Sequence, residues 1–230
     1  MRTLYLVPAR AGSKGLPGKN IKKLGGKPLI EFSIDFALKH LKLEDELCVS
    51  TNDYEVDQIV KNKGLKLHFE RSEELSTDIA TTQDVILHAL DYFKSIGKFF
   101  DMVFLLQPTS PFRTDSDWNA IVSAYDDSLD MVVSVKKTKE NPYFTLFEES
   151  DEGLLFKSKA GNYTSRQECP AVYSFNGSMY LINVKSLQEK KINEFRKVKK
   201  VIMPEERSVD IDTMADWVMA EFYLNKNENS

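Results

Sequence analysis

Apolar residues recur along this chain in two alternating rhythms. Short apolar runs at Thr3 to Val7, Leu47 to Ser50 and Met102 to Leu106 are typical of strands. Between them, apolar side chains return every three or four positions, which is helical spacing, over 29–41, 53–63 and 82–93. Strands that alternate with helices predict an open α/β sandwich, in which a mainly parallel sheet is covered on both faces.

Local signals refine these elements. Asn52 or Asp53 can cap the second helix and Gly64 can end it, before a further strand from Leu65 to Phe69. Later strands are expected at Ser178 to Asn183 and Val198 to Met203. A last amphipathic helix follows Asp212, and its expected core positions are Trp217, Val218, Phe222 and Tyr223.

The rhythm changes beyond Lys136. Residues from about 138 to 175 are polar, carry charged turns and show only short β-like pieces. We interpret them as an arm inserted into one domain that spans 1–230. A chain of 230 residues is long enough to bury such a core without covalent staples.

Composition excludes several classes of protein. The chain has 31 basic and 35 acidic residues spread along its length, which argues against duplex DNA or RNA as a partner. No stretch approaches the roughly 18 to 20 apolar residues of a membrane span, and the opening apolar run is too short for a signal peptide. Cys48 and Cys169 lack metal-ligand spacing, so we expect reduced thiols in a cytoplasmic protein.

Candidate chemistry begins in the loop from Val7 to Asn20, which combines three glycines, two prolines and the cations Arg10, Lys14 and Lys19. Glycine permits close backbone approach, and successive amides with nearby cations suit a polyphosphate. The loop follows the first strand, where ligands of open α/β sheets bind. Its spacing fits neither a Walker A motif nor a dinucleotide fingerprint. The alternative is a flexible surface turn with solvated lysines.

A second candidate is the turn from Gln107 to Arg113, directly after the apolar strand. Its amide, hydroxyl and guanidinium groups sit on a segment stiffened by two prolines and can hydrogen-bond a sugar or ribose. The alternative is that its hydroxyls and Asp115 only cap the helix that starts near Asp115.

The third candidate is the pair Asp210 and Asp212. Two carboxylates two residues apart project to the same side of an extended segment. Mg²⁺ prefers one or two carboxylates together with phosphate oxygens and water, so the pair fits a site completed by a nucleotide. Asp212 could instead cap the last helix.

Taken in order, three strings closely resemble the acylneuraminate cytidylyltransferases, also called CMP-sialic acid synthetases, across essentially the whole chain. The strings are Pro8-Ala9-Arg10-x-x-Ser13-Lys14-Gly15-x-x-x-Lys19-Asn20, Leu105 to Arg113, and Ser208 to Thr213. Supporting pieces are Val49 to Asp53, Arg71-x-x-Glu74-Leu75 with Asp78, Arg166-Gln167, Asn176-Gly177 and Tyr180. The resemblance implies a three-layer α/β/α, Rossmann-like nucleotidyltransferase fold of the GT-A-like kind.

The implied reaction is attack by the anomeric hydroxyl of a nine-carbon 2-keto sugar acid on the α-phosphorus of CTP, which yields the CMP-sugar and pyrophosphate. By position, the resemblance implies nucleotide binding by Ala9, Arg10, Ser13, Lys14, Lys19, Asn20, Arg71 and Thr82. It implies sugar binding by Gln107, Arg166, Asn176 and Tyr180. It implies a magnesium site at Asp210 and Asp212, where Mn²⁺ can substitute, and catalytic roles for Lys19, Arg10 and Asp210.

The acceptor side departs from the better-known sialic acid enzymes. Ser174-Phe175 precedes Asn176-Gly177, and Pro142 to Phe144 lies in the arm, where those enzymes often have Arg or Lys. N-acetylneuraminate, legionaminate and deaminated neuraminate (KDN) therefore stay open as acceptors. The Ser-Lys-Gly run at 13–15 argues against a KDO enzyme, and Gly15 argues against the pseudaminate branch. The resemblance also implies a homodimer formed through the arm. A non-catalytic module that binds CTP or a CMP-sugar is the remaining alternative.

Overall fold

The computed structural model describes residues 1–12 and 14–228. These residues form a central six-stranded sheet in the order β10-β6-β9-β5-β1-β4, together with two short hairpins. Its strands are β1 (Thr3–Ala9), β4 (Glu46–Thr51), β5 (Met102–Leu106), β6 (Met131–Lys137), β9 (Tyr173–Asn183) and β10 (Val198–Ile202). All run in one direction except β9, which is antiparallel to both of its neighbours. The predicted mainly parallel sheet is confirmed.

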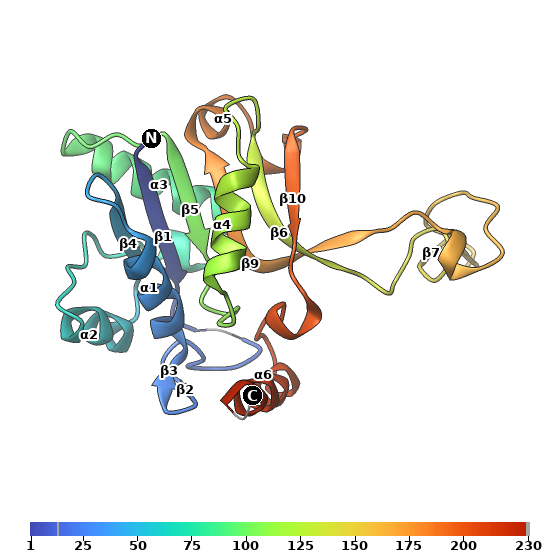
Figure 1. Cartoon of the computed structure of the whole chain (residues 1–230), viewed down its shortest axis with the longest axis horizontal. Helices are drawn as coiled ribbons and strands as arrows, with labels where there is room; N and C mark the ends of the chain where they lie inside the picture. The colour runs from blue at the N-terminus through green and yellow to red at the C-terminus, as the bar shows by residue number, and fades with distance from the viewer. Residues whose placement is uncertain (13, 229–230) are drawn as a thin grey trace.

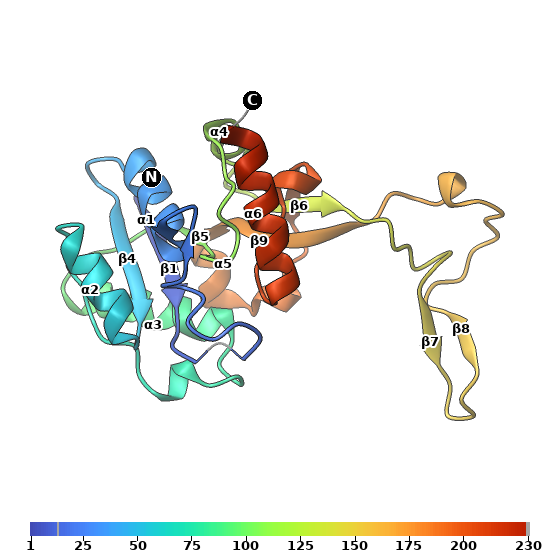
Figure 2. The ribbon, with the colours of Figure 1, turned by 90° about the horizontal axis from the view of Figure 1, so that it is seen from below.

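Helices cover both faces of the sheet (Figures 1 and 2). On one face lie α1 (Leu29–His40), α2 (Tyr54–Asn62) and α4 (Asp115–Ala124), and on the other lie α3 (Thr82–Ser95) and α5 (Val184–Glu189). Alternate residues of β1 serve the two layers: Tyr5 and Val7 pack toward α1, α2 and α4, and Leu4 and Leu6 pack toward α3 and α5. The three-layer prediction is confirmed, and burial on both faces explains why β5 is apolar throughout.

The last helix, α6 (Met214–Glu228), lies at the carboxyl end of β1, beside the hairpin of β2 (Lys23–Leu24) and β3 (Lys27–Pro28) (Figure 1). A separate apolar cluster joins α6 to the first loop, through side chains that include Leu16, Leu24, Ile211 and Trp217. The loop predicted to bind phosphate is therefore packed against the last helix, α6.

The arm projects from the body between β6 and β9 (Figures 1 and 2). It carries the hairpin of β7 (Phe147–Glu149) and β8 (Leu155–Lys157), which pair antiparallel. Pairing of 135–137 with 173–175 extends the sheet past the predicted start of this strand at Ser178. The inserted segment is thus 138–172, slightly shorter than predicted.

Two local predictions are wrong. Leu65 to Phe69 forms no strand: Leu65 and Leu67 pack on the core, and the segment meets the edge strand β4 through His68 Nε2 and the Leu47 carbonyl oxygen, 3.2 Å apart. In α6, Val218 is 56% exposed and Phe222 is 60% exposed, while Trp217 and Ala220 are buried. The helix buries only the narrow stripe that faces the first loop.

Helix ends follow capping chemistry. Asp53 caps α2, as one of the two predicted residues, and Gly64 follows with a φ of 72°. At α4 the cap is Thr114, which forms a capping box with Asp117, so Asp115 is not the cap.

Both cysteines are free, as expected. Within the described residues no helix is long and apolar enough to cross a membrane; the cytoplasmic location stays a prediction.

Asp130, directly before β6, ties the start of this strand to two neighbouring segments. Its buried carboxylate accepts hydrogen bonds from Ser186 Oγ (2.8 Å) and from the N–H groups of Arg196 and Lys197 (both 3.0 Å), and it pairs with Lys190 Nζ at 2.8 Å. Burial by itself would raise the pKa of Asp130. The hydrogen bonds and the ion pair outweigh it and hold that pKa well below the usual range.

We predict that Asp130→Ala lowers the free energy of unfolding by about 2–4 kcal/mol near pH 7, because it removes a buried acceptor that serves four donors at once. The folded pKa is depressed, so this stabilisation is complete above the ordinary carboxyl pKa of about 4 and is lost as the pH falls below it. Urea unfolding of both proteins at several pH values measures the difference. The same change at exposed Asp151 should have little effect, and a difference for Asp130→Ala that stays constant from pH 7 to pH 3 would contradict the assignment.

Candidate functional site

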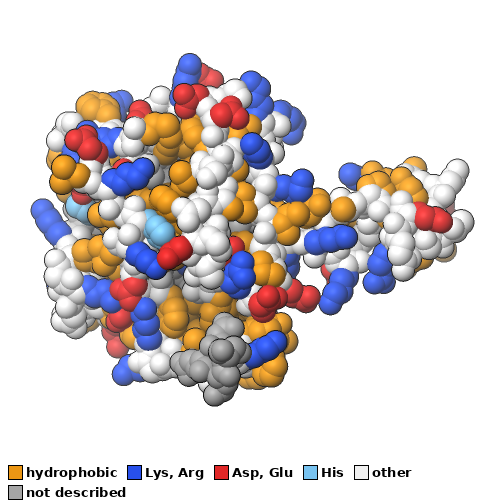
Figure 3. Space-filling model, viewed as in Figure 1, with side chains coloured by type: hydrophobic (Ala, Val, Ile, Leu, Met, Phe, Trp, Pro, Cys, Tyr) orange, Lys and Arg blue, Asp and Glu red, His pale blue; other side chains and the backbone are white. Residues whose placement is uncertain are grey.

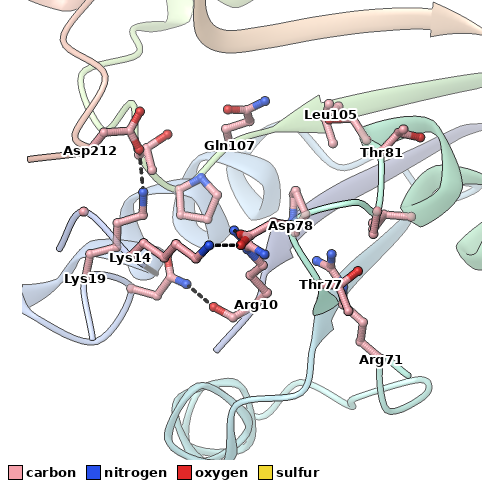
Figure 4. Close-up of a pocket in the computed structure, with 18 of the residues that line it drawn as sticks. Arg10, Lys14, Lys19, Arg71, Thr77, Asp78, Thr81, Leu105, Gln107 and Asp212 are labelled. Carbon is pink, nitrogen blue, oxygen red and sulfur yellow. Dashed lines mark hydrogen bonds and ion pairs between the residues drawn. The ribbon is translucent and has the colours of Figure 1, made fainter. Parts of the chain in front are cut away.

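A cavity of about 450 Å³ opens beyond the carboxyl ends of β1 and β5 (Figure 4). Four segments line it: the first loop, the segment 71–82 that leads into α3, the turn after β5, and the residues just before α6. Of the predicted site residues it brings together Arg10, Lys14, Lys19, Asn20, Arg71, Thr82, Gln107 and Asp212. Its volume lies within the range of about 300–1,000 Å³ that is usual for small-molecule sites.

The first loop is packed rather than free. Its Gly15 lies against the Asp212 backbone, where a Cβ would overlap the carbonyl oxygen, and Leu16 is buried against the α6 cluster. The buried Asn20 side chain donates to the Arg10 carbonyl at 3.2 Å. These contacts hold the loop so that its cations face the cavity, which does not fit a flexible surface turn.

The cavity is electropositive. Among the described residues, four cationic side chains line it, namely Arg10, Lys14, Lys19 and Arg71, against the two carboxylates of Asp78 and Asp212. Burial, with a smaller contribution from the nearby Arg10, lowers the pKa of Arg71 to about 10. The Arg71 Nε donates to the Leu75 carbonyl at 2.9 Å. Such a lining attracts an anion.

Three of the cations are paired across the cavity (Figure 4). Arg10 Nη2 lies 2.6 Å from Asp78, and Lys14 pairs with the same carboxylate. Lys19 Nζ lies 2.7 Å from Asp212 Oδ1 and 3.2 Å from the Ile211 carbonyl oxygen. Lys14 and Arg10 hold the pKa of Asp78 below its usual range.

The turn after β5 is fixed from behind by Arg113. This buried guanidinium donates to the carbonyls of Gln107 and Ser178 and to Ser33 Oγ (2.9 Å). Burial lowers the pKa of Arg113 to about 9, against an opposing effect of Asp210. Arg113 therefore supports the turn, and the Gln107 side chain is left to face the cavity (Figure 4).

Asp210 and Asp212 flank the buried Ile211, whose N–H donates to the Thr109 carbonyl at 2.8 Å. Asp212 does not cap α6, because Thr213 forms the capping box with Asp216. Asp210 packs on Gly177, where a Cβ would lie 2.8 Å from its Oδ2. Burial raises the pKa of Asp210; a hydrogen bond from Thr109 opposes this, and the neighbouring Asp212 adds to it.

The donor set fits a magnesium ion. Asp210 Oδ1 is buried and has no hydrogen-bond partner in the described part of the chain, so a polar partner is missing at this point. Within the described residues, no group of three or more His, Cys, Asp or Glu residues could hold a metal. A cation between Asp210 and Asp212 would therefore take its remaining ligands from water and substrate phosphate, as Mg²⁺ commonly does.

Other predicted residues lie outside this cavity. Ala9 is buried in β1, and Ser13 lies outside the described residues. Arg166 belongs to the arm and lines a second cavity of about 370 Å³ at the arm's root, with Lys137 and Lys139. Tyr180, on β9, lies near Asp210; burial, with a contribution from that carboxylate, raises its pKa to about 12.

Asn176, predicted to bind the sugar, has a structural place in the fold. Its side chain is buried, accepts a hydrogen bond from Ser134 Oγ (2.7 Å) and donates one to Ser208 Oγ (2.9 Å). Both polar ends of the amide are thus used between β6, β9 and the segment before Asp210. The interaction holds that segment next to the cavity.

The stretch just before α3 also belongs to the site, although no sequence motif gave its residues a role. Thr77, Asp78, Ala80 and Thr81 line the cavity, and Thr81 caps α3 with Asp84. The Thr-x-x-Asp spacing of that capping box is visible in the sequence and marks where the helix begins. The cavity thus also meets the amino end of α3, where the helix dipole favours negative charge.

Comparison with known proteins agrees with this geometry. Residues 4–223 match the sequence profile of the family described as Cytidylyltransferase. The chain is 33% identical over 231 residues to CMP-N,N'-diacetyllegionaminic acid synthase of Legionella pneumophila, covering 100% of this chain and 99% of that protein. It is 32% identical over 222 residues to N-acylneuraminate cytidylyltransferase of Streptococcus agalactiae, covering 95% of this chain and 52% of that protein.

The fold has a match among solved structures. CMP:2-keto-3-deoxy-manno-octonic acid synthetase complexed with CTP aligns with a TM-score of 0.71 and 19% identity, covering 99% of this chain and 100% of that one. At that identity the likeness concerns the fold alone. The family match covers nearly the whole chain, and a relative of the same length is one-third identical. The chain therefore belongs to the cytidylyltransferase family.

Proposed function

We propose that this enzyme transfers CMP from CTP to a nine-carbon 2-keto sugar acid and releases pyrophosphate. The observation that carries the proposal is the meeting of the loop cations with Asp212 at one electropositive cavity, with Asp210 two residues before it and near enough to Lys19 to feel its charge, in a chain of this family. The anomeric hydroxyl of the sugar attacks the α-phosphorus directly. Alignment and charge neutralisation supply most of the catalysis of such a transfer, and a covalent intermediate is unnecessary.

Each segment of the cavity has a part in this scheme. Arg10 and Lys14 bind the outer phosphates of CTP. Lys19, held next to Asp212, stabilises the charge that develops on the leaving pyrophosphate. Asn20, Arg71 and Thr82 face the cytidine, and Gln107 faces the acceptor sugar.

Asp210 and Asp212 would hold Mg²⁺, with Mn²⁺ as a substitute. The ion would supply positive charge to the phosphate oxygens there. Two contacts support this assignment: Gly177 packs against the Asp210 carboxylate, and the hydrogen bond of Ile211 fixes the backbone between the two carboxylates.

For the acceptor we infer an N-acylated nonulosonic acid, with N,N'-diacetyllegionaminate preferred to N-acetylneuraminate. The relative at 33% identity and matching length is named for N,N'-diacetyllegionaminic acid. The alignment with the N-acylneuraminate relative covers only 52% of that protein. KDN and KDO rank lower. Phe175 stands before Asn176 and contacts Tyr180, with ring centres 6.0 Å apart. Its aromatic side chain suits an acyl group of the sugar better than the Arg or Lys side chain of the sialic acid enzymes would.

The test is pyrophosphate release with CTP, Mg²⁺ and each of N,N'-diacetyllegionaminate, N-acetylneuraminate, KDN and KDO. We predict turnover with the first acid above the others. Lys19→Ala should lower kcat by about 10²–10³-fold, because it removes a preorganised cation. Lys42→Ala, at an exposed lysine away from the cavity, should leave kcat unchanged. Binding of CTP without release for any acid would favour a non-catalytic module, and full activity of Lys19→Ala would remove that residue from the site.

A second prediction concerns Gly177. Gly177→Ala places a methyl group against Asp210 and should lower kcat about tenfold or more, while raising the Mg²⁺ concentration needed for half-maximal rate. The matched control is Gly97→Ala, where φ is also positive, at 76°, but a Cβ meets no atom within 4 Å. Both variants carry similar backbone strain. Magnesium titrations of the rate should therefore separate them, and identical curves would contradict the role of Gly177.

We further propose that the arm joins two copies of the chain. Its hairpin exposes the large apolar side chains Phe147, Leu154, Leu155 and Phe156, and Figure 3 shows hydrophobic and basic side chains together on this projection. An apolar surface held away from the body is typical of an interaction site. Light scattering should give about twice the 26.4 kDa chain mass. Leu155→Glu with Phe156→Glu should give the monomer mass, and a monomeric parent protein would refute the proposal.

A further inference from the structure

One carboxylate sits among the cations proposed to bind phosphate and belongs to neither the metal pair nor a helix cap. Asp78 lines the cavity, lies 2.6 Å from Arg10 Nη2 and also pairs with Lys14. In Figure 4 its side chain points toward both cations. Asp78 thus pairs with the same two cations to which a phosphate group of a ligand would bind.

The segment that carries Asp78 is anchored at both ends. At one end the Arg71 N–H donates to the Thr51 carbonyl at 2.9 Å, and the Arg71 guanidinium binds the Leu75 carbonyl. At the other end Thr81 is fixed by its capping box with Asp84. Between these ends Arg10 Nη1 also donates to the Ser76 carbonyl at 3.1 Å, so the backbone of the segment has its own contact with Arg10. The Asp78 side chain can therefore leave the two cations without disturbing β4 or α3.

The ion pairs of Asp78 are of the weak kind. Its side chain is 46% exposed, that of Lys14 is 81% exposed and that of Arg10 is 31% exposed, and pairs open to water in this way add little stability. A polyphosphate carries several charges and binds the same two cations at once, so it can displace a single carboxylate.

We propose that Asp78 is an internal anion that competes with the outer phosphates of CTP for Arg10 and Lys14 and returns to them as pyrophosphate leaves. The assignment of CTP rests on the proposed function. Without Asp78 the two cations would hold the leaving group more tightly than release requires. Asp78 therefore lowers the affinity of the site for the polyphosphate chain and leaves the affinity for CMP unchanged.

The experiment is calorimetric titration of inorganic tripolyphosphate, pyrophosphate, CTP and CMP into the full-length protein and into Asp78→Asn, which keeps the shape and removes the charge. For Asp78→Asn we expect Kd values for tripolyphosphate, pyrophosphate and CTP that are about three- to tenfold lower than those of the parent protein, and an unchanged Kd for CMP. Asp78→Glu, which restores the charge, should reverse most of the gain. Asp91→Asn removes the same charge from an exposed position on α3 and should bind as the parent does.

Three results would overturn the proposal: unchanged or weaker tripolyphosphate binding by Asp78→Asn, an equal gain in Asp91→Asn, or an equal gain for CMP. The second would reduce the effect to net charge, and the third would place the competition at the α-phosphate. Tripolyphosphate tests Asp78 independently of the reaction. A parent protein that binds tripolyphosphate but not CTP would refute the proposed function, while the comparison of Asp78→Asn with its controls would still decide the role of Asp78.

Discussion

The contact between the first loop and the segment before α6 is the constraint on which the site depends. Residues 193 positions apart meet there, where Lys19 pairs with Asp212 and Gly15 lies against the Asp212 backbone. Below this contact, Leu16, Ile211 and Trp217 share one apolar cluster. The hydrophobic packing fixes the backbone of both segments, so the polar groups above it need no rearrangement to face a ligand.

The polar groups behind the cavity are separate from those that line it. Both Arg113 and Asn176 are buried. Arg113 donates hydrogen bonds to the Gln107 and Ser178 carbonyls, and Asn176 is hydrogen-bonded to the hydroxyls of Ser134 and Ser208. Buried polar groups are stable only when their hydrogen-bond partners are present. The hydrogen bonds of Arg113 and Asn176 therefore fix the positions of the turn after β5 and of the segment that carries Asp210. Asp78 and Asp212 take no part in this buried network, and their carboxylates pair with the cations of the cavity.

The sequence indicated the layers and the cavity because both follow from local patterns. Buried runs such as Met102 to Leu106 identify strands, and a parallel sheet brings the loops at their carboxyl ends to one edge. What it missed depends on distant partners. Leu65 to Phe69 has the composition of a strand but packs on the core through its side chains. Val218 and Phe222 have helical spacing but face solvent. Asn176 is buried and hydrogen-bonded to serines 42 and 32 positions away. Asp78 lay within a family motif, yet only the structure shows its two cations.

The way the arm leaves the sheet has a consequence for divergence. Its two ends, at Lys137 and Tyr173, are paired residues of neighbouring strands, so the body closes across its base as a hairpin does. A change of length or sequence within 138–172 therefore leaves the register of β6 and β9 intact, and with it the position of Gly177 under Asp210. The surface that the arm presents can drift from one relative to another while the nucleotide chemistry of the body is preserved.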